Sequence, residues 1–91
     1  MNEAINDIER RVVDLMRDHN MESYEYSLER YAYSGRGMSG ERSPLSVITK
    51  DDWTLPSTDP QSEIGATLIN MGFFVDNMGL GFVYFLKGVT P

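Results

Sequence analysis

The sequence predicts a single α+β domain over residues 1–91, with elements in the order α-β-β-α-β-β. We expect a four-stranded, mainly antiparallel sheet with both helices on one face. Three observations support this prediction. The chain of 91 residues is too short for two ordinary hydrophobic cores. Two segments have apolar residues at helical spacing, and four have the alternation or composition of strands. Short connections favour neighbouring elements that pack antiparallel.

The predicted helices cover residues 3–18 and 60–71, with apolar stripes formed by Ile5, Ile8, Val12, Leu15 and Met16 in the first, and by Ile64, Leu68 and Met71 in the second. Asn20 is expected to end the first helix, because asparagine tolerates the left-handed conformation at a C-terminus. Asp59 and Pro60 predict the start of the second helix, as its N-cap and its first helical residue. Gly72 predicts its end.

The predicted strands cover residues 23–33, 45–50, 73–77 and 81–87. The first strand alternates tyrosines with glutamates until Tyr31 and Tyr33, which fall on the glutamate face. A bulge near Arg30 would return both tyrosines to the core face; otherwise the end of the strand is covered on both sides. Trp53 and Leu55, in the connection after the second strand, are expected to fold back as a hydrophobic lid.

Charge and composition exclude several function classes. The chain has 14 acidic and 8 basic residues, and its net charge is -6. A nucleic-acid-binding protein needs a basic face, so direct binding of nucleic acid is not expected. The polar N-terminal segment does not resemble a signal peptide, and no apolar run is long enough to span a membrane. With no cysteine, the composition suits a reducing cytoplasm.

The sequence offers little for catalysis or metal binding. It contains one histidine, His19, and the simplest interpretation is a solvated side chain at a helix end. The pairs Asp51-Asp52 and Asp14-Asp18 can in principle hold a divalent ion, but their spacing is not that of a calcium loop. We therefore expect no metal site, no cofactor and no enzymatic activity.

Two glycine-containing loops are the candidate working surface. In the first, residues 34–44, Arg36 can clamp an anion while glycine N–H groups approach it; the alternative is a flexible hairpin tip with a solvated Arg36. In the second, residues 76–81, Met78 and Leu80 occupy a turn tip, which normally carries polar residues. They are either exposed contact residues or part of the core. We expect the two loops to lie together at one end of the sheet.

Two short motifs resemble a motif pair in small bacteriophage and mobile-element proteins. They are Tyr-Ser-Gly-Arg-Gly-Met at residues 33–38 and Asp-Asn-Met-Gly-Leu-Gly at residues 76–81. Related loops often have an aromatic residue after the methionine and a cysteine in the next strand, where this chain has Ser39 and Val47 or Ile48. No function that depends on that cysteine is carried over. The resemblance implies an inhibitor of host defence, a group that includes anti-CRISPR proteins, acting in the host cytoplasm.

Charge and resemblance favour the same partner, a host protein with a basic surface such as a CRISPR effector. Carboxylates would stand in for phosphates in its nucleic-acid groove, along an acidic row of Glu25 and Glu29 with Asp51 and Asp52. Two alternatives remain: an anion-binding module using both glycine loops, and a structural or assembly protein of a phage. The expected state is a monomer or small homo-oligomer. The expected partner-binding residues are Glu25, Glu29, Tyr33, Arg36, Met38, Asp51, Asp52, Asp76, Met78 and Leu80.

Overall fold

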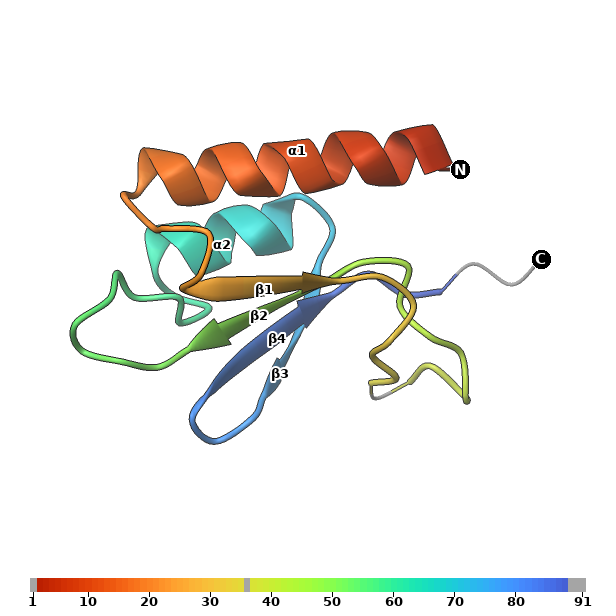
Figure 1. Ribbon diagram of the computed structural model, residues 1–91. Coiled ribbons are helices and arrows are strands. Elements are labelled where there is room, and N and C mark those ends of the chain that lie inside the picture. Colours follow the sequence, from red (N-terminus) through yellow and green to blue (C-terminus); the bar gives the residue numbers. More distant parts are fainter. Residues whose placement is uncertain (1, 36, 89–91) are drawn as a thin grey trace.

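The computed structural model describes residues 2–35 and 37–88, which form a layer of two helices over a four-stranded sheet (Figure 1). The elements are α1 (Asn2–Asp18), β1 (Tyr26–Glu29), β2 (Ser46–Lys50), α2 (Glu63–Asn70), β3 (Phe74–Asn77) and β4 (Gly81–Phe85). Both helices lie on the same face of the sheet (Figure 1). The predicted α+β class and element order are confirmed. The strands are shorter than predicted, β1 most of all.

Strand β4 is central to the sheet. The strand order is β1-β2-β4-β3, and each neighbouring pair is antiparallel. From β2 the chain passes through α2 to β3, and the next hairpin returns it into the gap between β2 and β3. All five residues of β4 are buried. Both faces of this strand must therefore be covered.

The helices cover one face of β4. Phe82 and Tyr84 lie on this face beside Val47 of β2, which pairs with Tyr84. The buried residues of this core are Ile5, Val12, Met16, Met21, Leu45, Val47, Ile64, Leu68, Phe73, Phe82 and Tyr84. The predicted stripes of both helices contribute to it, and their remaining members, Ile8, Leu15 and Met71, are partly buried at its margin.

Both helices end in a Schellman motif at the residues that the sequence indicates. After α1, Asn20 has φ +60°, and the N–H of Met21 donates to the carbonyl of Met16 at 2.9 Å. After α2, Gly72 has φ +105°, and the next N–H donates to the carbonyl of Leu68 at 3.1 Å. The left-handed residue reverses the chain and satisfies a carbonyl that the helix leaves open. The predicted helix ends are confirmed.

The predicted start of α2 is wrong by three residues. Ser62, and not Asp59, is the N-cap, and its hydroxyl accepts the N–H of Gly65 at 3.1 Å. The Asp59 carboxylate instead accepts the N–H of Gln61 at 2.8 Å, which makes a separate turn. A Cβ at Gly65 would lie 2.1 Å from the carbonyl oxygen of Asp59. The turn therefore packs against the helix rather than continuing it, and this contact requires glycine.

Tyr84 ties this turn to the central strand. Its side chain is fully buried, and its hydroxyl donates to the carbonyl of Thr58. The hydroxyl of Thr58 in turn donates to that of Thr49 on β2, at 2.7 Å. Burial, followed by the nearby charge of Asp59, raises the pKa of Tyr84 to about 12. The entry to α2 is thus fixed by buried hydrogen bonds.

The segment after β1 lies against Phe85 on the other face of β4. Strand β1 ends at Glu29, and Tyr31, with φ +56°, turns the chain. The N–H of Ser43 then donates to the carbonyl of Tyr33 at 2.7 Å, and the Tyr33 ring packs on Phe85 with centroids 5.3 Å apart. No bulge returns the tyrosines to the helix-side core. The Tyr33 ring instead lies on the far face, and Tyr31 is half-exposed, so the alternative of a strand end covered on both sides is also wrong.

We expect Leu68→Ala to lower the free energy of unfolding by about 2–5 kcal/mol, because this side chain is fully buried between helix and sheet. The neighbouring Ile69 is 41% exposed, so the matched variant Ile69→Ala is expected to cost less than ~1 kcal/mol. Urea unfolding followed by circular dichroism measures both. Similar losses in the two variants would contradict the assigned faces of α2.

The stability of the fold is expected to fall at high pH because of Tyr84. Its pKa is about 12 in the folded chain, against 10.0 for an unperturbed tyrosine. The stabilisation is fully present below about pH 10 and is lost as the pH rises towards 12, about 2–3 kcal/mol in all. Urea midpoints across this range should fall more steeply in the unmodified protein than in Tyr84→Phe. Equal slopes would show that this hydroxyl is not responsible.

Candidate functional site

One end of the sheet carries a concentration of exposed apolar side chains. We call it the hairpin end: residues 22–25 before β1, residues 51–54 after β2, and residues 78–80 between β3 and β4. The antiparallel register brings these segments to one end of the sheet. The N–H of Asp51 donates to the carbonyl of Leu80 at 2.8 Å, which joins two of them directly.

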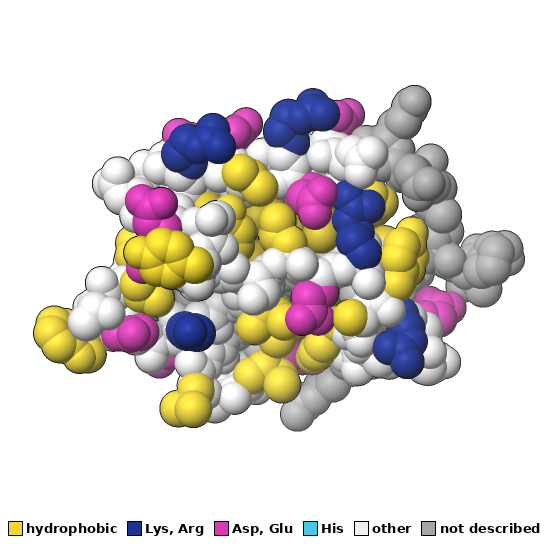
Figure 2. Space-filling model, viewed as in Figure 1, with side chains coloured by type: hydrophobic (Ala, Val, Ile, Leu, Met, Phe, Trp, Pro, Cys, Tyr) yellow, Lys and Arg dark blue, Asp and Glu magenta, His cyan; other side chains and the backbone are white. Residues whose placement is uncertain are grey.

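Four large side chains at this end are exposed. The exposed fractions are 94% for Trp53, 87% for Leu80, 81% for Tyr24 and 57% for Met78. Figure 2 shows hydrophobic side chains projecting at the left and lower left, among acidic ones. Apolar side chains grouped in this way typically mark an interaction site. The predicted lid is wrong for Trp53, whereas Leu55 packs partly against the core.

Carboxylates surround these apolar side chains. Glu25 accepts the N–H of Glu22 at 2.7 Å. Asp52 accepts the N–H and the hydroxyl of Thr54 at 2.9 and 2.8 Å, and these hydrogen bonds lower its pKa. Asp51 is exposed beside them. The local hydrogen bonds therefore fix the orientation of the Glu25 and Asp52 carboxylates.

In the described part of the chain, the arginines that form ion pairs do so with acidic residues of α1 and not with those of the hairpin end. Three ion pairs within 4.0 Å occur among the described residues, and each uses an acid of α1. They are Arg10–Asp7 at 3.2 Å, Arg17–Asp14 at 3.6 Å and Arg30–Glu9 at 2.8 Å. None of them involves a carboxylate of residues 22–25 or 51–52. The negative charge of the hairpin end is therefore less compensated than that of α1, although Lys50 is close by.

The structure brings five of the predicted partner-binding residues to the hairpin end, namely Glu25, Asp51, Asp52, Met78 and Leu80. Glu29 lies at the other end of β1, where it pairs with Ser46. Four residues of extended chain separate Glu29 from Glu25, roughly 13 Å. The predicted acidic row is therefore interrupted, and its larger part lies at the hairpin end.

Three other predicted residues serve the far face of the sheet. The hydroxyl of Tyr33 donates to the Asp76 carboxylate. Met38 is 2% exposed, and its sulfur accepts the N–H of Gly35 at 3.3 Å. The first contact ties Tyr33 to β3, and the second lies within the segment that follows β1. Arg36 lies outside the described residues.

The two glycine motifs do not form one site. Residues 31–43 leave the sheet at the end where Glu29 pairs with Ser46, whereas residues 78–80 lie at the opposite end (Figure 1). The expectation that the loop tips lie together is wrong, because the strands between them run the full length of the sheet. The motifs meet at one described hydrogen bond, between Tyr33 and Asp76.

Sequence reasoning missed Tyr24 and Trp53 as surface residues. Tyr24 fits the strand alternation, but β1 begins only at Tyr26 because the preceding residues form a turn. Trp53 lies in a turn closed by the N–H of Leu55 on the carbonyl of Asp52, at 2.9 Å. An aspartate two residues before a threonine is a common turn signal, and it was available in the sequence.

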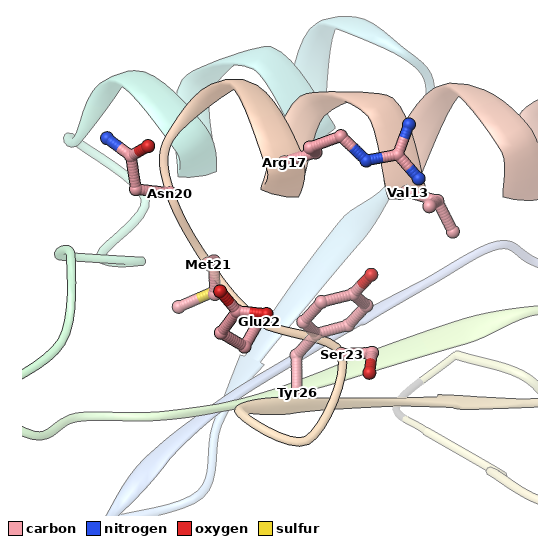
Figure 3. Close-up of a pocket in the computed structure, with 7 residues that line it drawn as sticks. All are labelled: Val13, Arg17, Asn20, Met21, Glu22, Ser23 and Tyr26. Carbon is pink, nitrogen blue, oxygen red and sulfur yellow. The ribbon is translucent and has the colours of Figure 1, made fainter.

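A polar hollow of about 370 Å³ adjoins the hairpin end, between the last turn of α1 and the start of β1 (Figure 3). Its lining includes Arg17, Glu22, Ser23 and Tyr26. Figure 3 shows the Tyr26 ring standing up from β1 towards α1. Burial raises the pKa of this tyrosine, against the charge of Arg17. A lining with both charges does not select anions.

No described residues form a group of three or more histidine, cysteine, aspartate or glutamate side chains able to hold a metal ion. Over the same part of the chain, no helix has the length and apolar character needed to cross a membrane. The exposed groups of the hairpin end are aromatic and aliphatic side chains together with carboxylates.

We expect Trp53→Ala and Leu80→Ala to change the free energy of unfolding by no more than about 0.5 kcal/mol each, because both side chains are almost fully exposed. Urea unfolding of the two variants beside the unmodified protein measures this. A loss of ~2 kcal/mol or more in either variant would mean that the side chain packs against the fold.

Comparison of the chain with protein-family models, with curated proteins and with solved structures finds no significant match.

Proposed function

We propose that this protein is a non-enzymatic inhibitor that binds a host defence protein through the hairpin end. The partner has a basic nucleic-acid-binding groove, and a CRISPR effector is the class we favour. The observation that carries the proposal is the combination at one end of the sheet of exposed Trp53, Leu80 and Tyr24 with carboxylates that no described arginine neutralises.

The apolar side chains would supply most of the binding free energy. Tryptophan and tyrosine are enriched among the residues that dominate protein interfaces, because each buries a large area with few rotatable bonds. In the free protein, 94% of the surface of Trp53 and 87% of that of Leu80 is exposed to water. A partner that covers these side chains therefore removes nearly all of this surface from water. A partner with an apolar depression beside its basic groove fits this arrangement.

The carboxylates would give orientation and speed. Glu25, Asp51 and Asp52 present negative charge next to the apolar side chains, as phosphates do in a nucleic acid. The net charge of -6 extends the attraction beyond direct contact. These carboxylates would guide the encounter with a basic groove, and in the complex they would exclude nucleic acid from that groove.

The anion-binding alternative has less support. It requires both glycine loops to contribute N–H groups to one ligand, and their tips lie at opposite ends of the sheet. No specific observation favours a structural or assembly role in a phage over inhibition. The inhibitor proposal also implies that the protein acts in the host cytoplasm, where such effectors operate.

The direct test measures displacement of labelled target DNA from purified CRISPR effector complexes of each defined type, by fluorescence anisotropy. We expect dose-dependent displacement from at least one of them near equimolar protein. The protein alone should leave the anisotropy of the free DNA unchanged. Retention of DNA by every complex at a large excess of protein would reject the proposal.

Two pairs of variants separate the contributions of charge and apolar contact on the effector that responds. Trp53→Ala and Leu80→Ala should each accelerate dissociation by about tenfold or more, as anchor residues do. Asp51→Lys should mainly slow association, in a salt-dependent way, because exposed charges are screened over about 8 Å at physiological ionic strength. Surface plasmon resonance at two salt concentrations measures both rates.

The control for the charge reversal is Glu29→Lys, which changes the net charge equally but lies at the other end of β1. It should slow association less than Asp51→Lys. Equal effects of the two reversals would show that only the overall charge matters. Unchanged dissociation in the Trp53 and Leu80 variants would show that another surface binds the effector.

A further inference from the structure

The free edge of β3 is a second surface equipped for binding. Among residues 2–35 and 37–88, strand β3 has one neighbour in the sheet, β4. The N–H of Met78 donates to the carbonyl of Gly81 at 2.9 Å, so these two residues form a hydrogen-bonded pair. In an antiparallel ladder every second residue forms such a pair, so Asp76 and Phe74 also bond to β4. It follows that the backbone N–H and C=O groups of Val75 and Asn77 point away from β4. Such groups are a template for another strand.

Hollows and apolar side chains accompany this edge. A hollow of about 380 Å³ at the start of β3 is lined by residues that include Ile69, Phe74 and Lys87. A second, of about 290 Å³, is lined by residues 75–78. Ile69 and Phe74 are 41% and 46% exposed, and the ammonium of Lys87 lies 4.4 Å from the centre of the Phe74 ring. Side chains of an added strand would find apolar surface here.

A second copy of this chain fits the edge poorly. In the antiparallel register that sets Val75 opposite Asn77 of the other copy, Asp76 lies directly opposite its own copy. Like charges directly opposite each other destabilise a sheet. Centring the pair on Val75 instead requires the N–H of Phe73, which already donates to Leu68 at 3.1 Å.

We propose that the edge of β3 binds an extended peptide segment of a partner, antiparallel to β3, with a lysine or arginine opposite Asp76. Alternate residues of a strand share a face, so the residue two positions later lies opposite Phe74 and is aliphatic. The chemistry recognised is basic-x-aliphatic. The charge complementarity comes from Asp76, which the Tyr33 hydroxyl holds on the far face of the sheet, and from the net charge of -6. This surface is additional to the hairpin end.

The probe is the capped hexapeptide Thr-Thr-Lys-Val-Val-Thr, titrated into ¹⁵N-labelled protein and followed by NMR. In the proposed register its lysine lies opposite Asp76, and its two valines lie opposite Val75 and Phe74. We expect the largest shifts at the amides of Val75 and Asn77. Largest shifts at residues 51–54 or 78–80, or none at β3 at millimolar peptide, would overturn the proposal.

Methylation of single peptide nitrogens tests strand addition on the unmodified protein. Methylating the N–H of the first valine, which faces Val75, should abolish binding because it removes a ladder donor. Methylating the N–H of the lysine, which points away from β3, should leave binding within about twofold. Equal effects of the two methylations would exclude strand pairing.

The charge requirement is tested with Asp76→Asn, which keeps an acceptor for Tyr33. This variant should bind the lysine peptide about two- to fivefold more weakly, as expected for loss of a cross-strand pair of opposite charges. The matched variant Asp18→Asn, at the exposed end of α1, should bind it as the unmodified protein does. Equal weakening in the two variants would show that only the net charge attracts the peptide.

The remaining outcome is self-association. Shifts at Val75 and Asn77 that grow with protein concentration in the absence of peptide would mean that a second copy occupies the edge, and would overturn the proposal. The peptide tests need no defence protein, so their result is independent of whether an effector binds the hairpin end.

Discussion

The fold depends on covering both faces of β4. Its five residues, Gly-Phe-Val-Tyr-Phe, are all buried, and the strand pairs with β2 on one side and β3 on the other. Phe82 and Tyr84 require an apolar layer on one side, which the helices provide. Val83 and Phe85 are buried on the other side, where the ring of Tyr33, from a segment with no helix or strand assigned to its described residues, packs on Phe85. The hydrogen bond of Tyr84 with Thr58 also fixes where α2 can begin.

This requirement explains why the first glycine motif is structural. A loop of glycines and serines has no periodicity, so it reads as a candidate ligand loop. In the fold, the Tyr33 ring from this segment packs on Phe85 of the far face, and Met38 is buried beside Gly35. The hydrogen bond of Tyr33 with Asp76 then connects the loop to the edge strand. The hairpin end and the outer edge of β3 do not cover β4, and they remain exposed.

The hairpin end and the β3 edge offer different chemistry. At the hairpin end, side chains project singly from turns, and the exposed groups are aromatic rings, aliphatic chains and carboxylates. Along β3 the binding groups are backbone N–H and C=O, with one carboxylate and one aromatic ring beside them. The first suits a folded partner with a depression, and the second suits an extended segment.

The sequence by itself determined the elements, their order and the two helix ends, because helical stripes and a left-handed Asn20 or Gly72 are local signals. It also predicted an acidic row of Glu25, Glu29, Asp51 and Asp52, from which the structure separates Glu29 at the other end of β1. Only the tertiary structure decided the rest. The start of α2 depends on the contact of Gly65 with Asp59, the end of β1 on Tyr31, and the role of Tyr33 on the need to cover Phe85. Trp53 and Leu55 are both large side chains in one connection, and only the path of the chain between β2 and α2 packs Leu55 partly against the core and leaves Trp53 exposed.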